Sequence, residues 1–524
     1  MASLMLASAS ALEVPCETQP GRAGHSATKT PSSSGSITTR YFIVPVCIYR
    51  VGKSTWALAG QGRTVIIDAA RWNQKNSARS QLFMMRLIRG SWLRNTLLVL
   101  GLASVLARAQ SIEAKPDDPF FAKFSPTRGP APAGLVLKAG DRLAICGDSI
   151  TEQRMYSRII ETYLTVCVPE LDVTVRQYGW SGEKADGFLG RMTNDCLRFQ
   201  PTIATTCYGM NDHGYRVYEE SIGKRYREYQ TGIVEAFKSA GARVILGSAG
   251  CVGKNPPWGS KDPAATMEAL NLNLCELRNI DVEIARQEGV GFADVFWPML
   301  TANFTARQKY GEGYALPGKD GVHPGWAGHL VMAYAYLRAL GLDGEIGRYT
   351  VDLAAGHAMV SKGHELIAFK DGELRVKSAR YPFCTPAANL SADDNIRSGM
   401  SLVPFNQELN RLTLVVKGAS AANYEVTWGD ESHRYTAAQL AAGINLAEDF
   451  VKNPFSGPFA KVDDAVAAKQ AYETRQIKDL FHGPEGRADR EKTASLTEEA
   501  RAPLAAAVKR AMVPVTHSLR ITPL

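Results

Sequence analysis

The sequence predicts an α/β fold built on a parallel sheet, and two observations favour this class. Short apolar runs alternate strictly with segments of helical periodicity. The segments between the runs are long enough for helices, so successive strands can lie parallel with helices covering both faces of the sheet. The expected strands are 143–146, 173–177, 203–208, 244–247 and 290–295, and the expected helices are 155–167, 186–199, 218–239, 266–287 and 325–340.

A chain of 524 residues is too long for one ordinary core and indicates several domains. We predict the α/β domain over 135–345, a β-rich accessory unit over 346–440 and a mainly helical region over 441–524. In the accessory unit, Asp371-Gly372 joins two alternating runs and predicts a hairpin. The accessory unit either shapes or binds substrate, or it is a stabilising appendage.

Two further runs, 411–416 and 424–428, extend the β pattern of the accessory unit. Helical periodicity then covers 460–481, and Ser495-Leu-Thr-Glu498 resembles a capping box before a helix toward residue 510. We expect these C-terminal helices to pack back on the α/β domain.

Residues 84–109 have the order of a secretory signal peptide. A basic stretch, an apolar run over 96–106 and Ala107-Arg108-Ala109 follow one another. The apolar run is short for a membrane span, so we expect export to the periplasm or the medium without stable membrane insertion. The preceding residues 1–83 lack sustained periodicity and are predicted to be a non-native or disordered extension, with a true extension as the alternative; 110–134 is predicted to be a linker.

The charge distribution argues against a nucleic-acid partner. The net charge is +8, but the basic excess lies in residues 1–109, and the remainder is close to neutral. The cysteines after Ala109 lack the spacing of a zinc site, so we expect no structural metal. Their number is odd, so at least one is unpaired. One or two disulfides are compatible with export, but the sequence does not show which cysteines pair. These cysteines are Cys146, Cys167, Cys196, Cys207, Cys251, Cys275 and Cys384.

Polar groups follow the predicted strands where chemistry gathers in parallel sheets. Ser149 ends the first strand in Gly-Asp-Ser, Gly182 follows the second, and Asn211 follows the third. Asp320 and His323 stand before the last helix. An Asp three residues before a His in a turn can bond to its Nδ1, which leaves Nε2 to accept a proton from a serine.

The order Gly-Asp-Ser, Gly, Gly-x-Asn-Asp, Asp-x-x-His resembles the SGNH, or GDSL, hydrolase family over residues 139–342. The resemblance implies a flavodoxin-like three-layer α/β/α fold. It also implies that Ser149 is the nucleophile, His323 the general base and Asp320 the residue that orients it. Ser149, Gly182 and Asn211 would form the oxyanion hole. This chemistry requires no cofactor and no metal.

Four further residues are candidates for lining the substrate site, each with a simpler interpretation. Asp148 would stabilise the turn through backbone hydrogen bonds. Arg154 and His213 each follow a motif and are otherwise solvated loop residues. Trp180 either packs in the core or stacks on a sugar. His329 is interpreted as a surface or capping histidine.

The sequence therefore predicts a serine ester hydrolase that removes short acyl groups, most simply O-acetyl, from carbohydrate. A lipid or lysophospholipid acylhydrolase is one alternative, and an inactive glycan-binding protein is another. The expected partner is a small-molecule or polysaccharide ester, and the oligomeric state is left open. No essential catalytic residue is expected after Leu342.

Overall fold

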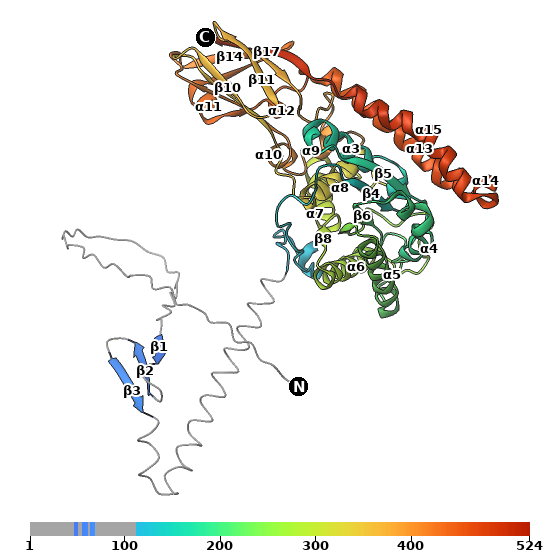
Figure 1. The fold of residues 1–524 in the computed structure, drawn as a ribbon. Helices are drawn as coiled ribbons and strands as arrows, with labels where there is room; N and C mark the ends of the chain where they lie inside the picture. Colours follow the sequence, from blue (N-terminus) through green and yellow to red (C-terminus); the bar gives the residue numbers. More distant parts are fainter. Residues whose placement is uncertain (1–46, 51–54, 61–62, 69–111) are drawn as a thin grey trace, which may run out of the picture. The chain divides into compact units, whose positions relative to one another are not determined.

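The structure, a computed structural model, describes residues 47–50, 55–60, 63–68 and 112–524 (Figure 1). It divides into two units, Met1–Leu100 and Gly101–Leu524. In the first unit, three antiparallel strands are hydrogen-bonded in chain order, because short runs rich in Thr, Val and Ile favour extended backbone. These strands lie within the predicted extension 1–83, whose remainder, like the predicted signal peptide, lies outside the described residues. The strands are β1 (Cys47–Arg50), β2 (Thr55–Gly60) and β3 (Arg63–Asp68).

The second unit contains the predicted parallel sheet. Its strand order is β5-β4-β6-β7-β8, and every pairing in it is parallel. All five predicted strands are confirmed, and the order reverses next to β4, which brings the carboxyl ends of β4, β5 and β6 together. The strands are β4 (Arg142–Gly147), β5 (Thr174–Gly179), β6 (Ile203–Cys207), β7 (Arg243–Gly247) and β8 (Gly291–Ala293).

Helices cover both faces of this sheet (Figure 1), as the alternating pattern predicts. In β4, Leu143 and Ile145 join the core cluster under α3 and α8, while Ala144 and Cys146 join the cluster under α4 and α5. This alternation follows from the period of two in a strand. The helices are α3 (Tyr156–Cys167), α4 (Ala185–Asp195), α5 (Glu220–Ser239), α6 (Met267–Glu288), α7 (Phe296–Tyr310) and α8 (Trp326–Ala339).

The predicted linker 110–134 is not a free connection. Its 3-10 helix η1 (Pro119–Lys123) places Phe121 in the core, and Phe124, directly after it, is also fully buried. Phe121 packs edge-on against Trp297 and Phe304 of α7, a helix that the periodicity analysis did not find. The prediction is wrong because two aromatic side chains bury enough apolar area to fix an otherwise Pro- and Ala-rich segment.

Two sheets make up the accessory unit. One has the order β10-β9-β13-β16 and the other β11-β12-β17-β14-β15. The Asp371-Gly372 hairpin is confirmed, with φ of 49° and 75° at its two turn residues. The strands are β9 (Glu345–Asp352), β10 (His357–Val360), β11 (His364–Lys370), β12 (Glu373–Ser378), β13 (Arg411–Lys417), β14 (Asn423–Trp428), β15 (Glu431–Thr436), β16 (Ile444–Asn445) and β17 (Val515–Pro523).

The last strand, β17, corrects the predicted boundary at 440/441. It lies between β12 and β14, so the region after 441 is not only helical. Its alternate residues His517, Leu519 and Ile521 are buried, as the period of two requires.

The C-terminal arm, defined here as residues 456–511, consists of α13 (Ser456–Arg475), the π-helical turn η4 (Gln476–Phe481), α14 (Pro484–Ala488) and α15 (Arg490–Ala511). The arm packs on α3 and β5, as expected (Figure 1). The predicted capping box at Ser495 is wrong, because α15 begins earlier: the Asp489 side chain caps it by accepting from the Lys492 N–H.

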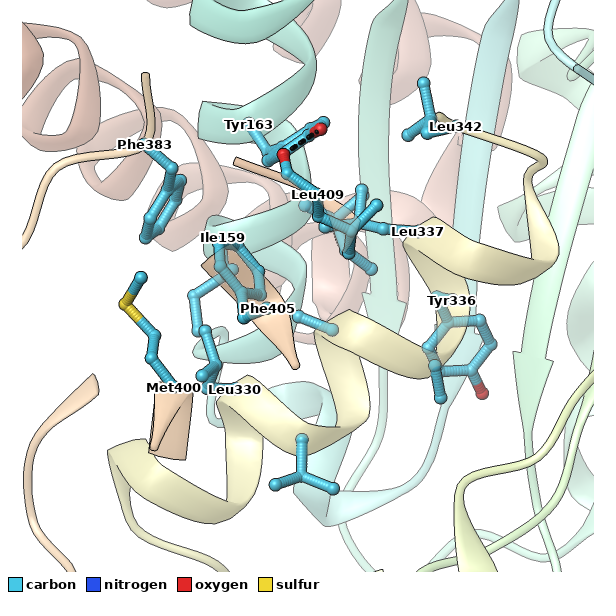
Figure 2. Packing of buried hydrophobic residues seen from close by; sticks show 14 of the residues in the cluster. Ile159, Tyr163, Leu330, Tyr336, Leu337, Leu342, Phe383, Met400, Phe405 and Leu409 are labelled. Atoms are coloured by element: carbon cyan, nitrogen blue, oxygen red, sulfur yellow. Dashed lines mark hydrogen bonds between the residues drawn. The ribbon is translucent and has the colours of Figure 1, made fainter. Parts of the chain in front are cut away.

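The accessory unit shares its core with the α/β domain. Figure 2 shows Ile159 and Tyr163 of α3 beside Phe405 and Leu409, with a hydrogen bond of 2.6 Å from the Tyr163 hydroxyl to the Leu409 carbonyl. The remaining short helices are α2 (Ser149–Glu152), η2 (Pro169–Leu171), η3 (Leu197–Phe199), α9 (Ile396–Met400), α10 (Phe405–Glu408), α11 (Ala437–Ala442) and α12 (Leu446–Asp449).

Within the described residues, no helix is long and apolar enough to cross a membrane. The same part of the chain holds no cluster of three or more His, Cys, Asp or Glu side chains arranged to bind a metal ion. All seven cysteines named above are buried and free.

Candidate active site

Ser149 stands at the junction between β4 and the short helix α2. The Asp148 carboxylate caps this helix by accepting from the Ile150 N–H at 2.9 Å. Ser149 Oγ then lies 2.8 Å from Nε2 of His323, a residue 174 positions later in the chain. The end of the strand thus presents the hydroxyl to an imidazole within hydrogen-bond reach.

Asp320 holds the His323 ring from the other side. Its Oδ2 lies 2.7 Å from His323 Nδ1, and its Oδ1 accepts from the N–H groups of Val322 and His323, each at 2.9 Å. Burial raises the pKa of Asp320, but these hydrogen bonds outweigh burial and lower the pKa overall. An ionised Asp320 makes Nδ1 the protonated nitrogen and leaves Nε2 free to accept from Ser149.

The loop after β5, residues 179–182, comes very close to α2. A Cβ at Gly179 would lie 2.2 Å from the Glu152 backbone nitrogen, so only glycine allows this approach. Gly182 has a φ of 73°. Among the described residues, the N–H groups of Ser149 and Gly182 have no hydrogen-bond partner. Both are therefore free to bind an oxyanion.

Asn211, on the loop after β6, links the other two loops. Its Nδ2 donates to the Glu183 carbonyl at 3.0 Å and makes a longer contact of 3.4 Å with Asp148 Oδ2. Its Oδ1 accepts from the Tyr215 hydroxyl at 3.3 Å. The 3.4 Å contact is weak, so the N–H that makes it is the one available to an oxyanion.

Two buried carboxyl groups beneath the site have raised pKa values. Burial, with the charges of Asp212 and Glu183, raises the pKa of Asp148 to about 7. Burial raises the pKa of Asp212 to about 6. The raised pKa favours the neutral form of Asp148 in particular, which lessens the negative charge beside the position where an oxyanion would develop.

Comparisons with known proteins agree with this arrangement. The model of the GDSL-like Lipase/Acylhydrolase family matches residues 145–331. These residues form a GDSL-like lipase/acylhydrolase domain. The domain is that of an ester-bond hydrolase, and its α/β/α architecture confirms the predicted fold class.

Solved structures similar to this chain include the gut microbial diltiazem-metabolizing enzyme BT4096, which is 22% identical with a TM-score of 0.60 over 75% of this chain and 100% of that one. It shares the fold. The acetylxylan esterase Axe2 from Geobacillus stearothermophilus is 21% identical with a TM-score of 0.33, over 40% of this chain and 97% of that one. LAE5, an alpha/beta hydrolase from the metagenome of Lake Arreo, Spain, is 22% identical with a TM-score of 0.31, over 40% of this chain and 98% of that one. No curated protein matches the chain.

The structure brings Ser149, Gly182, Asn211, Asp320 and His323 of the GDSL domain together. The other candidates have mainly internal contacts. Trp180 packs between the Arg191 guanidinium and the Lys478 ammonium, with ring-centre distances of 5.0 and 5.4 Å, which favours packing over sugar stacking. Arg154 reaches Thr474 of the C-terminal arm at 3.4 Å. His213 is fully buried beside Tyr215, and burial lowers its pKa to about 4.

The interpretation of His329 as a surface histidine is wrong, but the ring does cap a helix, since it accepts from the first N–H of α3. The ring is fully buried, accepts from the Tyr156 N–H at Nδ1 over 3.2 Å and meets Gln153 Oε1 at Nε2 over 3.1 Å. Burial lowers its pKa to about 3, so it is neutral. It supports the turn between α2 and α3 from within.

Sequence reasoning missed Trp258, which follows β7 in the GDSL domain. Its side chain is 49% exposed, and its ring centre lies 5.7 Å from that of His323 and 6.3 Å from that of Tyr215. The sequence could have indicated this residue, because its loop follows a strand of the parallel sheet, as the other site loops do, and contains the turn sequence Pro-Pro-Trp-Gly. Glu152 and Lys478 were also missed, because their link is not visible in local sequence.

Proposed function

We propose that this protein is a serine ester hydrolase in which Ser149, His323 and Asp320 act together to remove short acyl groups, most simply O-acetyl, from carbohydrate. The observation that carries the proposal is the hydrogen-bonded chain from Ser149 Oγ to His323 to Asp320, at 2.8 and 2.7 Å. Two unpaired N–H groups lie on the loops beside it. Nucleophile, base, orienting carboxylate and oxyanion donors are thus all supplied.

The proposed reaction proceeds through an acyl-enzyme. His323 Nε2 takes the Ser149 proton as Oγ attacks the ester carbonyl, and the N–H groups of Ser149 and Gly182, with Asn211 Nδ2, bind the oxyanion. His323 then protonates the leaving alcohol oxygen as the C–O bond breaks. Water, deprotonated by His323, attacks the acyl-enzyme. His323 then returns that proton to Ser149 Oγ as the bond from Oγ to the acyl carbon breaks, and the acid is released.

The surroundings of the site support a short acyl group. The five cavities described for residues 112–524 have volumes of about 300 to 450 Å³, and none is lined by Ser149, Asp320 or His323. The side chains of His323 and Asp320 are 29% and 33% exposed. A long acyl chain requires an apolar channel, whereas the cavity beside Gly182 and Asn211 is lined by charged residues that include Lys184, Asp212 and Arg216, so the surroundings suit an acetyl group better.

Trp258 supports a carbohydrate as the alcohol. Its exposed ring lies next to His323, where the leaving alcohol must receive its proton. Sugar rings present apolar C–H faces that pack on aromatic rings. A pyranose seated on Trp258 would therefore bring its ester oxygen within reach of His323.

Activity on acyl esters of different length, and on acetylated polysaccharides, tests this proposal. We expect hydrolysis of acetate esters to exceed that of octanoate esters in kcat/KM by at least about tenfold, which corresponds to about 1.4 kcal/mol. Ser149→Ala should abolish hydrolysis of both esters. A preference for octanoate would indicate a lipid acylhydrolase, and polysaccharide binding without Ser149-dependent turnover would indicate an inactive glycan-binding protein. Trp258→Ala should raise KM for the polysaccharide and leave small esters unaffected.

A further inference from the structure

We infer that Glu152 and Lys478 are positioning residues for the oxyanion loop, defined here as residues 179–182, so that the C-terminal arm completes the active site of the GDSL domain. The inference rests on the proposed function, since it names the groups that hold the Gly182 N–H in place. Lys478 belongs to η4, which lies outside residues 145–331.

Glu152 connects the serine turn to the oxyanion loop through both of its carboxylate oxygens. Oε2 accepts from the Ser181 N–H at 2.5 Å and from the Ser181 hydroxyl at 2.6 Å, while Oε1 accepts from Lys478 Nζ at 2.6 Å. Glu152 ends α2, whose first residue is Ser149, and Ser181 directly precedes Gly182. The contact therefore fixes the distance between two oxyanion donors.

The charge of Lys478 favours the ionised form of Glu152. The side chains of Lys478 and Glu152 are only 25% and 20% exposed. Burial raises the pKa of Glu152, but hydrogen bonds from Lys478 and Ser181 outweigh it and lower the pKa overall. Without the ammonium group, the largely buried Glu152 carboxylate loses its counter-charge and is drawn toward solvent. This change weakens its hold on Ser181.

The arm also supports the oxyanion loop from outside, through Trp180. Lys478 lies over the Trp180 ring at 5.4 Å, and His482 packs edge-on against it at 4.9 Å. His482 Nε2 is in turn 2.7 Å from Asp195 Oδ2, a buried carboxylate at the end of α4. The loop is therefore held between α4 and the arm, in addition to its bond to Glu152.

Other contacts of the arm do not reach the oxyanion loop, which allows a matched comparison. Arg198 of η3 bonds to Glu491 of α15 at 2.8 Å, at the solvent-exposed side of the arm. Glu491 contacts neither α2 nor residues 179–182. Loss of the Arg198–Glu491 pair removes one arm contact and leaves the positioning contacts intact.

Steady-state kinetics of the full chain with p-nitrophenyl acetate test the inference. Lys478→Met retains the aliphatic stem over Trp180, and we expect it to lower kcat by about tenfold or more with little change in KM, because a displaced oxyanion donor acts mainly in the transition state. Glu152→Gln should have a similar effect, and the double variant should be little worse than either single variant. Lys478→Arg should restore most of kcat, and Glu491→Gln should keep the parental value.

Amide hydrogen exchange provides a readout that does not depend on activity. Lys478→Met should accelerate exchange over residues 179–184, while Glu491→Gln should not. The inference is overturned if Lys478→Met keeps the parental kcat and exchange, or if the two arm variants lose kcat equally. If the parent shows no Ser149-dependent turnover, the proposed function fails, and exchange alone decides whether Lys478 positions the loop.

Discussion

At the residue scale, the site depends on which nitrogen or oxygen carries each proton. Asp320 accepts from two backbone N–H groups as well as from His323 Nδ1, so three donors specify its ionised form. That in turn fixes the imidazole tautomer, and only this tautomer can accept a proton from Ser149. The three residues therefore form one functional unit rather than three independent contributions.

Because they form a unit, their substitutions should be strongly non-additive. Ser149→Ala and His323→Ala should each remove nearly all of kcat/KM, and the double variant should be little worse than either. Asp320→Asn should retain the fold yet lower the rate severely, since an amide donor at this position favours the wrong tautomer. Rates on p-nitrophenyl acetate measure these effects. Parental turnover by folded Ser149→Ala would contradict the assignment.

Sequence could predict this group because each of its members lies in a local motif. Asp320 and His323 are three residues apart in one turn, and Ser149, Gly182 and Asn211 each follow a strand of the same sheet. Glu152 and Lys478 are 326 positions apart, and no periodicity connects them. The burial of His329 was missed for a related reason: an apolar helix shows which type of element forms, but not how deeply each polar residue lies.

At the scale of elements, the parallel sheet was predictable because its strands are short, mainly apolar runs that alternate with helical segments. The position of β17 was not, since an alternating strand pattern at the chain end does not reveal which strands it will pair with. Between β12 and β14, β17 places His517 in a buried polar chain with Trp428, Ser378 and His364.

Donor and acceptor geometry makes His517 of this chain neutral. Trp428 Nε1 can only donate, so His517 Nδ1, at 3.1 Å, must accept. His517 Nε2 then donates to Ser378 Oγ at 3.0 Å. That hydroxyl lies 2.8 Å from His364 Nδ1, and the Tyr349 hydroxyl lies 3.1 Å from each of the two. His364 Nε2 donates to the Ile346 carbonyl at 3.1 Å. Burial lowers the pKa of His517 to about 3 and lowers that of His364.

The accessory unit should therefore lose stability in acid. Between about pH 6.5, the ordinary histidine pKa, and about pH 3, His517 binds a proton in the unfolded chain but not in the folded one, so the free energy of unfolding falls as pH falls. His517→Gln should make this slope shallower by up to about 1.4 kcal/mol per pH unit. Denaturant unfolding at a series of pH values measures it, with exposed His357→Gln as control. An unchanged slope would refute the neutral assignment.

At the scale of the whole molecule, the second unit does not follow the predicted domain boundaries. One core cluster extends from Phe121, before the GDSL domain, to Ile521 in β17. The arm adds a buried ion-pair network in which Lys469 lies 3.1 Å from Glu161 of α3 and 2.7 Å from Glu473. Composition and turn residues show where the secondary-structure pattern changes along the chain. They do not show that the segments on either side of such a change share one hydrophobic core.

Because the core of the second unit already includes Phe121, the chain can be cleaved only ahead of this part of the core. We propose that the chain is exported and cleaved after Ala109, so that the mature protein begins at about Gln110. Ile112 forms a bridge with Thr127, and the Glu113 carboxylate accepts from the Gly129 N–H at 2.8 Å. Cleavage after Ala109 would retain both contacts. N-terminal sequencing of secreted protein that still carried residues 1–83 would contradict this processing.

Two shortened chains then separate removable residues from required ones. A chain beginning at Gln110 should keep the melting temperature and kcat of the full chain. A chain beginning at Ser125 lacks Phe121 and Phe124, both fully buried against α7, and each buried phenylalanine contributes about 1.5–3 kcal/mol. We therefore expect a fall of several degrees in its melting temperature, measured by calorimetry, with exposure of apolar surface on α7. Equal stability of the two chains would show that 110–124 is a linker after all, because buried aromatic rings cannot be removed from a packed core without cost.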